Sequence, residues 1–251
     1  MVSVLVRDGG LTTFALSNEL DNQCIQLTNG NAPDGDLPSM FNETKYQYFL
    51  ALLRGLNAGV KRASPSARTV VNSGGWKHYG WYTRLVADKL DFDIIGYHWY
   101  SSMGDFNDTN PSSSPAHSGS HTNVLQALTK YKKKIWITEM NHQGGSSAGN
   151  FTNPDPSGEA AQAGYLQHEL AVMSKLAEEN PLFDEGVIFI YELYNQPDMG
   201  HTPNLTCTTG RDGESCYGLR KFTQRLSFSA FRHGTACEKQ CLSRAHEPFQ
   251  L

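Results

Sequence analysis

The feature that most constrains the fold is a regular alternation of short apolar runs with one-sided helical patterns. Strand-like runs are expected at residues 13–17, 68–72, 92–98, 135–139 and 187–191. Helical patterns are expected between them, at residues 45–63, 79–90, 122–132 and 158–179. The first helical pattern places apolar residues at i, i+3 and i+4, as an amphipathic helix does. Strands that alternate with helices predict parallel βαβ units, because a parallel connection needs a crossover that a helix supplies.

Length and charge bound the class of protein. The chain has 251 residues, of which 39% are hydrophobic, so it can bury a sizeable core in one large domain. Its formal net charge is −4, and its basic residues are scattered apart from a lysine triplet at 132–134, which excludes a strong electrostatic footprint for nucleic acid. No apolar run approaches the ~20 residues of a membrane span. We therefore expect no nucleic-acid or membrane partner, and the oligomeric state stays open.

The number of strands leads to a specific hypothesis about the fold. A (β/α)8 TIM barrel needs eight strands, whereas the pattern predicts five. We expect an α/β chain that is such a barrel without its first three units, so that strands 4–8 are present. Residues 1–220 would form the partial barrel, and residues 221–251 a cysteine-containing tail. A five-stranded doubly wound sheet is the alternative.

Two glutamates lie where a parallel barrel carries its chemistry. Glu19 and Glu139 each come at the end of an apolar run and are followed by polar, loop-like sequence. Catalytic groups of parallel barrels lie at the C-terminal ends of the strands. A glutamate there can also be a helix-capping or surface acid, but two at matching positions favour a site. They are 120 positions apart, so only the fold could bring them together. Two such acids are what cleavage of a glycosidic bond requires.

The motifs around these acids resemble those of clan A glycoside hydrolases. Ser17-Asn-Glu-Leu-Asp21 resembles the Asn-Glu motif on the fourth strand of that clan, and Trp136-Ile-Thr-Glu139 resembles the motif of the nucleophile on the seventh. Tyr97-His-Trp-Tyr100 is similar to the sixth strand, and residues 187–197 to the eighth strand of the family 39 type. The resemblance covers residues 11–220.

The resemblance implies a retaining glycoside hydrolase that acts on a β-linked oligo- or polysaccharide by double displacement. Glu19 would be the acid/base, Glu139 the nucleophile, and Asn18 a hydrogen-bond partner of the sugar 2-hydroxyl. In an undistorted strand, Asn18 and Glu19 would point to opposite faces. The implied roles therefore require a bulge or bend at this strand end.

The residues expected to bind substrate are mostly aromatic, because aromatic rings offer sugars an apolar platform. They are Asn18, Trp76, Tyr97, His98, Tyr100, Tyr191 and Tyr194. Core packing explains the aromatic residues equally well, and His98 could equally be a core histidine.

Other catalytic schemes lack their first requirement. The chain has no GxSxG, GxGxxG, Walker lysine or HExxH motif. We expect carbohydrate as substrate, with no cofactor and no metal. The alternative from another class is a catalytically inactive carbohydrate-binding or interaction protein derived from a truncated barrel.

Sequons and cysteines indicate the secretory pathway or the extracellular space, although no signal peptide is recognisable. Four Asn-X-Thr sequons begin at Asn42, Asn107, Asn150 and Asn204. Four of the five cysteines lie in the last 45 residues and lack the spacing of a zinc site. We expect disulfides in the tail, including one between Cys207 and Cys216, and one thiol left over.

Overall fold

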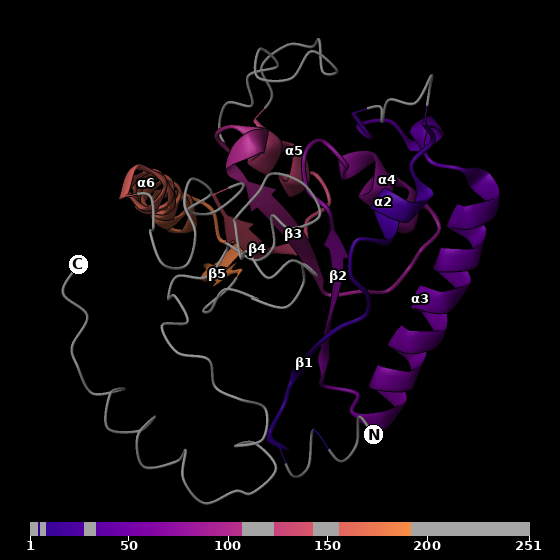
Figure 1. Cartoon of the computed structure of the whole chain (residues 1–251). Coiled ribbons are helices and arrows are strands. Elements are labelled where there is room, and N and C mark those ends of the chain that lie inside the picture. Colours follow the sequence, from indigo (N-terminus) through magenta and orange to yellow (C-terminus); the bar gives the residue numbers. More distant parts are fainter. Residues whose placement is uncertain (1–4, 6–8, 28–33, 107–122, 143–155, 192–251) are drawn as a thin grey trace, which may run out of the picture.

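The computed structural model of the chain describes residue 5 and residues 9–27, 34–106, 123–142 and 156–191. Within these ranges, five strands alternate with helices along the chain (Figure 1). The strands are β1 (Thr13–Ala15), β2 (Arg68–Ser73), β3 (Ile94–Tyr100), β4 (Lys134–Asn141) and β5 (Phe183–Ile190). Each of the five predicted strands is therefore confirmed, although β5 begins four residues earlier than expected.

The four predicted helices are also present, and two of them, at residues 79–87 and 124–129, are shorter than expected. The helices are α2 (Leu20–Cys24), α3 (Glu43–Ala63), α4 (Tyr79–Ala87), α5 (Val124–Thr129) and α6 (Pro156–Glu179), with 3-10 turns η1 (Pro38–Met40) and η2 (Ser101–Met103). The sequence pattern did not predict α2 or the two turns. Elements of three to five residues are too short to show a helical period.

The strand order decides between the two predicted architectures. The sheet has the order β1-β2-β3-β4-β5, and every neighbouring pair is parallel. A doubly wound sheet would reverse its direction of winding at a switch point. Sequential order has no such reversal, so the doubly wound alternative is wrong. The five strands form a curled half-barrel.

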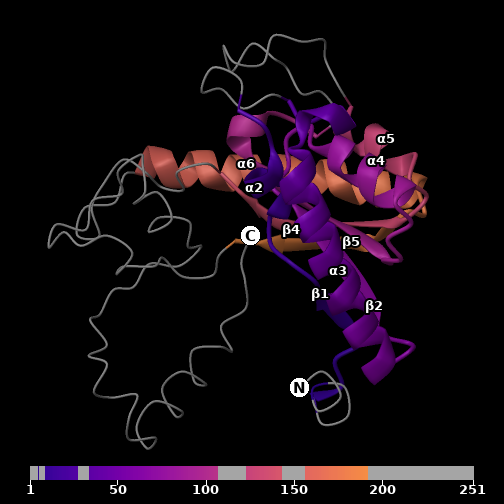
Figure 2. The same ribbon diagram turned by 90° about the vertical axis from the view of Figure 1, so that its right-hand side faces the viewer.

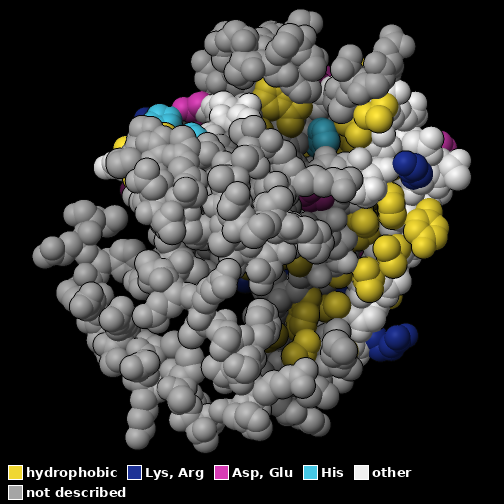
Figure 3. Space-filling model, viewed as in Figure 1, with side chains coloured by type: hydrophobic (Ala, Val, Ile, Leu, Met, Phe, Trp, Pro, Cys, Tyr) yellow, Lys and Arg dark blue, Asp and Glu magenta, His cyan; other side chains and the backbone are white. Residues whose placement is uncertain are grey.

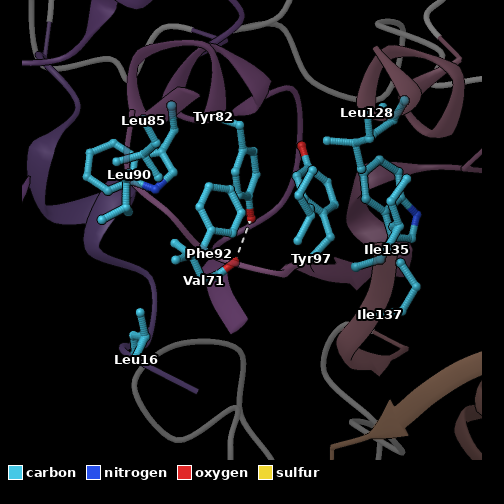
Figure 4. Packing of buried hydrophobic residues seen from close by; sticks show 14 of the residues in the cluster. Leu16, Val71, Tyr82, Leu85, Leu90, Phe92, Tyr97, Leu128, Ile135 and Ile137 are labelled. Carbon is cyan, nitrogen blue, oxygen red and sulfur yellow. Dashed lines mark hydrogen bonds between the residues drawn. The ribbon is translucent and has the colours of Figure 1, made fainter. Parts of the chain in front are cut away.

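The two faces of the sheet differ in what covers them. Val71, Ile95 and Ile135 belong to one large apolar core with side chains of the helices α3, α4, α5 and α6 (Figure 4). Val70 and Ile94, their neighbours in the strands, point the other way and join a small separate cluster. Figures 1 and 2 show the helices gathered along one face of the sheet. Residues alternate between the helix-covered face and the inner face, as the pleat of a strand requires.

Helix α3 shows why the amphipathic prediction succeeded. Asn42 caps its first turn by accepting a hydrogen bond from the backbone N–H of Lys45. The buried side includes Leu50 and Leu53, whereas Leu52 on the opposite side is 41% exposed. Figure 3 shows hydrophobic side chains gathered over this helix. The cap and the apolar stripe together account for where the helix begins and which face it buries.

A polar network ties the N-terminal edge of the sheet to the end of α3. Asp93, just before β3, accepts hydrogen bonds from Lys61 Nζ at 2.7 Å and from the backbone N–H of Thr69 at 2.8 Å. Thr69 in turn donates to the amide oxygen of Asn57 at 2.8 Å. Burial acts to raise the pKa of Asp93, but the donors from Lys61 and Thr69 outweigh it and the pKa lies below the ordinary 3.8.

Several predictions lie outside the described residues. These are the disulfide of Cys207 with Cys216, the site residue Tyr194, the sequons at Asn107, Asn150 and Asn204, and the tail at 221–251. Cys24 is described, and it is a buried free thiol. No helix in the described part of the chain is long and apolar enough to cross a membrane.

Candidate active site

The chain bends sharply where Glu19 leaves the end of β1. The strand ends at Ala15, a bend follows at Asn18, and Glu19 has φ 48° and ψ 41°. This left-handed conformation is uncommon for a residue other than glycine. The break in strand geometry is the one that the sequence analysis required. It frees the side chain of Glu19 from the strict alternation of the strand.

A bulge in β4 directs Glu139. Tyr97 of β3 pairs with Ile137, but the next residue, His98, pairs with Glu139, so Thr138 is an extra residue in β4. Without this bulge, Glu139 would share the helix-covered face of Ile137, two positions earlier. The register shift turns Glu139 to the inner face instead. Two local departures from regular strand geometry therefore orient the two glutamates.

His98 lies between the two carboxylates. Its Nδ1 is 2.7 Å from Oε1 of Glu19 and 3.3 Å from Oε2 of Glu139. One donor atom from each of the three residues lies within 4.8 Å of the other two. The fold thus brings together two acids that are 120 positions apart in the sequence.

Each carboxylate has a further hydrogen-bond donor. The Tyr100 hydroxyl donates to Oε2 of Glu139 at 2.8 Å, and Nδ2 of Asn22 donates to Oε2 of Glu19 at 3.0 Å. The side chains of Glu19 and Glu139 are 32% and 22% exposed, whereas that of His98 is 1% exposed. The two acids are therefore accessible to solvent, and the imidazole that orients them is closed off behind them.

A buried aspartate holds the loop that carries Glu19. Asp21 is fully buried and accepts hydrogen bonds from Ser73 Oγ at 2.8 Å and from the backbone N–H of Gly74. Its Oδ2 also lies 2.6 Å from Nδ1 of His78. A Cβ at Gly74 would come within 2.2 Å of Asn22 Nδ2, so only glycine leaves room for the amide that donates to Glu19. These contacts position Glu19 relative to the end of β2.

Asp21, Ser73 and His78 were not predicted to belong to this arrangement. One signal was present, because Gly74 and Gly75 directly follow an apolar strand. Paired glycines at a strand end indicate close approach of another segment. Nothing in the sequence identified Asp21 as the approaching group.

The position of Tyr97 differs from its predicted role. Expected to bind substrate, it is fully buried in the helix-covered core, between Tyr82 and Leu128 (Figure 4). Its hydroxyl donates to the backbone carbonyl of Trp76. The reason is the alternation of β3, which points Tyr97 toward the helices and its neighbour His98 toward the glutamates.

The other predicted substrate-binding residues differ in whether they lie beside the two glutamates. Asn18 is exposed beside Glu19, and Tyr100 contacts Glu139. Trp76 lies in the loop after β2 with φ 50°, and its indole N–H donates to Asp34 at 3.1 Å. Tyr191 is partly buried after β5, where its carbonyl accepts from Asn141. The structure therefore groups His98 and Tyr100 with the acids and ties Trp76 and Tyr191 to other partners.

The two acids are close neighbours in the folded chain. One carboxylate oxygen of Glu19 lies within 4.8 Å of one of Glu139, so both groups can reach the same bond of one substrate. The same carboxylate and imidazole donors are also of the types that hold a divalent cation.

Comparison with known proteins gave matches among solved structures alone. No family model and no curated protein sequence matches the chain. A GH53 catalytic domain from Ignisphaera aggregans is similar, with a TM-score of 0.48, 18% identity, and coverage of 75% of this chain and 50% of that domain. A Bacteroides fragilis protein, provisionally assigned as a beta-galactosidase, has a TM-score of 0.46, 16% identity, and coverage of 88% and 27%. The chain thus spans half the length of the first and about a quarter of the second. Neither description names family 39, and that assignment stays a prediction.

Proposed function

We propose that the chain is a retaining glycoside hydrolase that acts on β-linked oligo- or polysaccharides, with Glu139 as nucleophile and Glu19 as acid/base. The observation that supports this proposal most strongly is the pair of partly exposed carboxylates around the buried His98, at the C-terminal edge of a parallel sheet. We further propose that the half-barrel belongs to a (β/α)8 architecture, in which that edge carries the chemistry.

In the first step, Glu139 attacks the anomeric carbon while Glu19 protonates the departing glycosidic oxygen. The Tyr100 hydroxyl donates a hydrogen bond to Oε2 of Glu139 and holds this carboxyl group in position for the attack. Nδ1 of His98 lies 2.7 Å from Oε1 of Glu19 and holds this carboxyl group in position.

In the second step, Glu19 accepts a proton from a water molecule that attacks the same anomeric carbon. The bond to Glu139 breaks, and the carboxylate is restored. Two inversions at one carbon leave the product with the configuration of the substrate. Asn18, exposed next to Glu19, is proposed to bind the sugar 2-hydroxyl.

The proposal is tested by trapping the covalent intermediate. The full chain is screened against aryl β-glycosides and β-linked polysaccharides, and is then treated with the matching 2-deoxy-2-fluoro glycoside, which slows breakdown of the intermediate. Mass spectrometry of the digested protein should place one sugar on the peptide that contains Glu139. Glu139→Gln should remain unlabelled, while Glu179→Gln, an exposed acid at the end of α6, should label like the wild type.

Three outcomes would count against the assignment. A product with inverted configuration would exclude the covalent route, and a label on another residue would move the nucleophile. Saturable sugar binding measured by calorimetry, without turnover of any substrate, would favour the carbohydrate-binding alternative.

A further inference from the structure

A second cluster of two carboxylates and a histidine lies apart from the candidate active site and shares no residue with it. Asp105 follows η2 in the segment after β3, while His168 and Glu169 are neighbours on α6. His168 Nε2 is 2.6 Å from Oδ2 of Asp105. One donor atom from each of the three residues lies within 4.8 Å of the other two. The cluster therefore connects two elements that are far apart along the chain.

The buried member of this cluster has an oxygen without a partner. Glu169 is 1% exposed, and its Oε2 has no hydrogen-bond partner in the described part of the chain. The backbone N–H of Phe106 donates to the same carboxyl group. Burial of a carboxylate costs several kcal/mol unless the group is paired, neutralised or bound to a metal. The hydrogen bond from Phe106 still leaves Oε2 of Glu169 without a partner among the described residues.

Two further buried polar atoms lack hydrogen-bond partners among the residues that the structure describes. They are the hydroxyl of Tyr165, one helical turn before Glu169 on α6, and Nδ1 of His142. The rings of Tyr165 and His142 are in edge contact, with centroids 6.0 Å apart. Native structures hold few buried polar atoms without partners, and a group of them indicates a bound water or ion.

We propose that Asp105, His168 and Glu169 bind a divalent transition-metal ion, with Zn²⁺ as the best-suited ion. Two carboxylate oxygens and one imidazole nitrogen are ligands that Zn²⁺ takes together. Ca²⁺ and Mg²⁺ favour sites made of oxygen alone, so the imidazole selects against them. The charge of the ion would balance the two acids and supply the partner that Glu169 Oε2 lacks.

Such an ion would act as a structural link. It would join the segment after β3 to α6, and Phe106 next to Asp105 is already buried in the core against Trp99. No metal was expected from the sequence, because the cysteines lack the spacing of a zinc site and there is no HExxH motif. Asp105 lies 63 positions before His168, and the two form no recognisable motif. The pairing of these residues exists only in the folded chain.

The proposal is tested by metal titration of the full chain after treatment with a chelator. Isothermal calorimetry and thermal unfolding are measured with ZnCl₂, CaCl₂ and MgCl₂ in turn, and Co²⁺ absorption reports the ligand environment. We expect Zn²⁺ to bind and to raise the melting temperature more than Ca²⁺ or Mg²⁺ does. His168→Gln should weaken this binding at least about tenfold, the loss typical even of residues that only support a ligand.

The variants are chosen so that loss of metal binding can be distinguished from loss of folding. The His168 side chain is 58% exposed, so His168→Gln should fold even if the isosteric Glu169→Gln does not. Because Glu19, His98 and Glu139 are also potential ligands, Glu139→Gln is the matched control and should retain the Zn²⁺ effect. Absence of a Zn²⁺ effect, an equal effect in His168→Gln, or a response to Ca²⁺ alone would overturn the proposal. None of these readouts depends on glycosidase activity.

Discussion

The two edges of the sheet each carry a polar network, and the networks differ in the charged groups that they bring together. At the N-terminal edge, Asp93 accepts hydrogen bonds from Lys61 and from the backbone N–H of Thr69. At the C-terminal edge, Glu19 and Glu139 share the single imidazole of His98. The N-terminal edge joins a carboxylate to a cation, whereas the C-terminal edge brings two carboxyl groups to the imidazole of His98.

This difference separates stability from chemistry. Paired charges with complete hydrogen bonding hold α3 against the starts of β2 and β3, and they present no group that needs a ligand. Two partly exposed acids side by side are what the proposed double displacement requires. Barrel proteins often divide their two edges in this way, with catalysis at the C-terminal edge.

The sharpest test of the comparison is Glu139→Gln. We expect kcat/KM to fall at least about 10³-fold, as when one member of a catalytic group is removed. The free energy of unfolding should change little, because glutamine has the shape of glutamate and its amide oxygen can still accept the hydrogen bond from Tyr100. Hydrolysis assays and urea unfolding check the two expectations, with Glu179→Gln as control. Loss of stability together with activity would show that this edge is structural.

A smaller and substrate-dependent effect is expected for Glu19→Ala. Loss of the acid/base should slow substrates with poor leaving groups by about 10²–10⁴-fold, the contribution typical of general acid catalysis. Activated aryl glycosides need less protonation and should be affected less. Added azide should restore part of the rate, because it replaces the water that has lost its general base. An equal loss for every leaving group, without rescue, would argue against the acid/base role.

At the N-terminal edge, Asp93→Asn should change stability and leave activity as it is. The partly exposed ion pair with Lys61 should contribute about 1 kcal/mol to the free energy of unfolding at pH 7. Since the pKa of Asp93 is lowered in the folded state, this contribution is complete above the ordinary 3.8 and is lost as the pH falls through the folded pKa. Urea unfolding of both proteins from pH 7 to pH 2 measures the loss. A difference that persists at pH 2 would exclude the charge as its cause.

The smallest expected effect concerns Cys24, at the end of the helix that follows Glu19. Burial raises the pKa of its thiol to about 11, so little thiolate forms at neutral pH. A short pulse of iodoacetamide should leave the Cys24 peptide unlabelled in the native chain and label it in denaturant. Rapid native labelling would mean that α2 opens and that the position of Glu19 is not held as described.

Much of the fold could be predicted because its signals are local. Helix α3 shows its period over twenty-one residues and its capping asparagine directly before them. The candidate acids were also predictable, since Glu19 and Glu139 each mark the end of an apolar run. Helix α2 was not predictable, because five residues show no clear period. The role of Asp21 was not predicted, because its hydrogen-bond partners lie at residues 73–78, more than fifty positions later in the chain.

The sequence alone determined the alternation of strands and helices and the two acids at strand ends, because periodicity and apolar runs are properties of neighbouring residues. Tertiary structure decided which side chains meet. The bulge at Thr138 turned Glu139 toward His98, and ordinary alternation buried Tyr97 among the helices. Packing also placed Glu169 beside Asp105. Each of these outcomes depends on the register between strands and on contacts between distant segments, which no local pattern encodes.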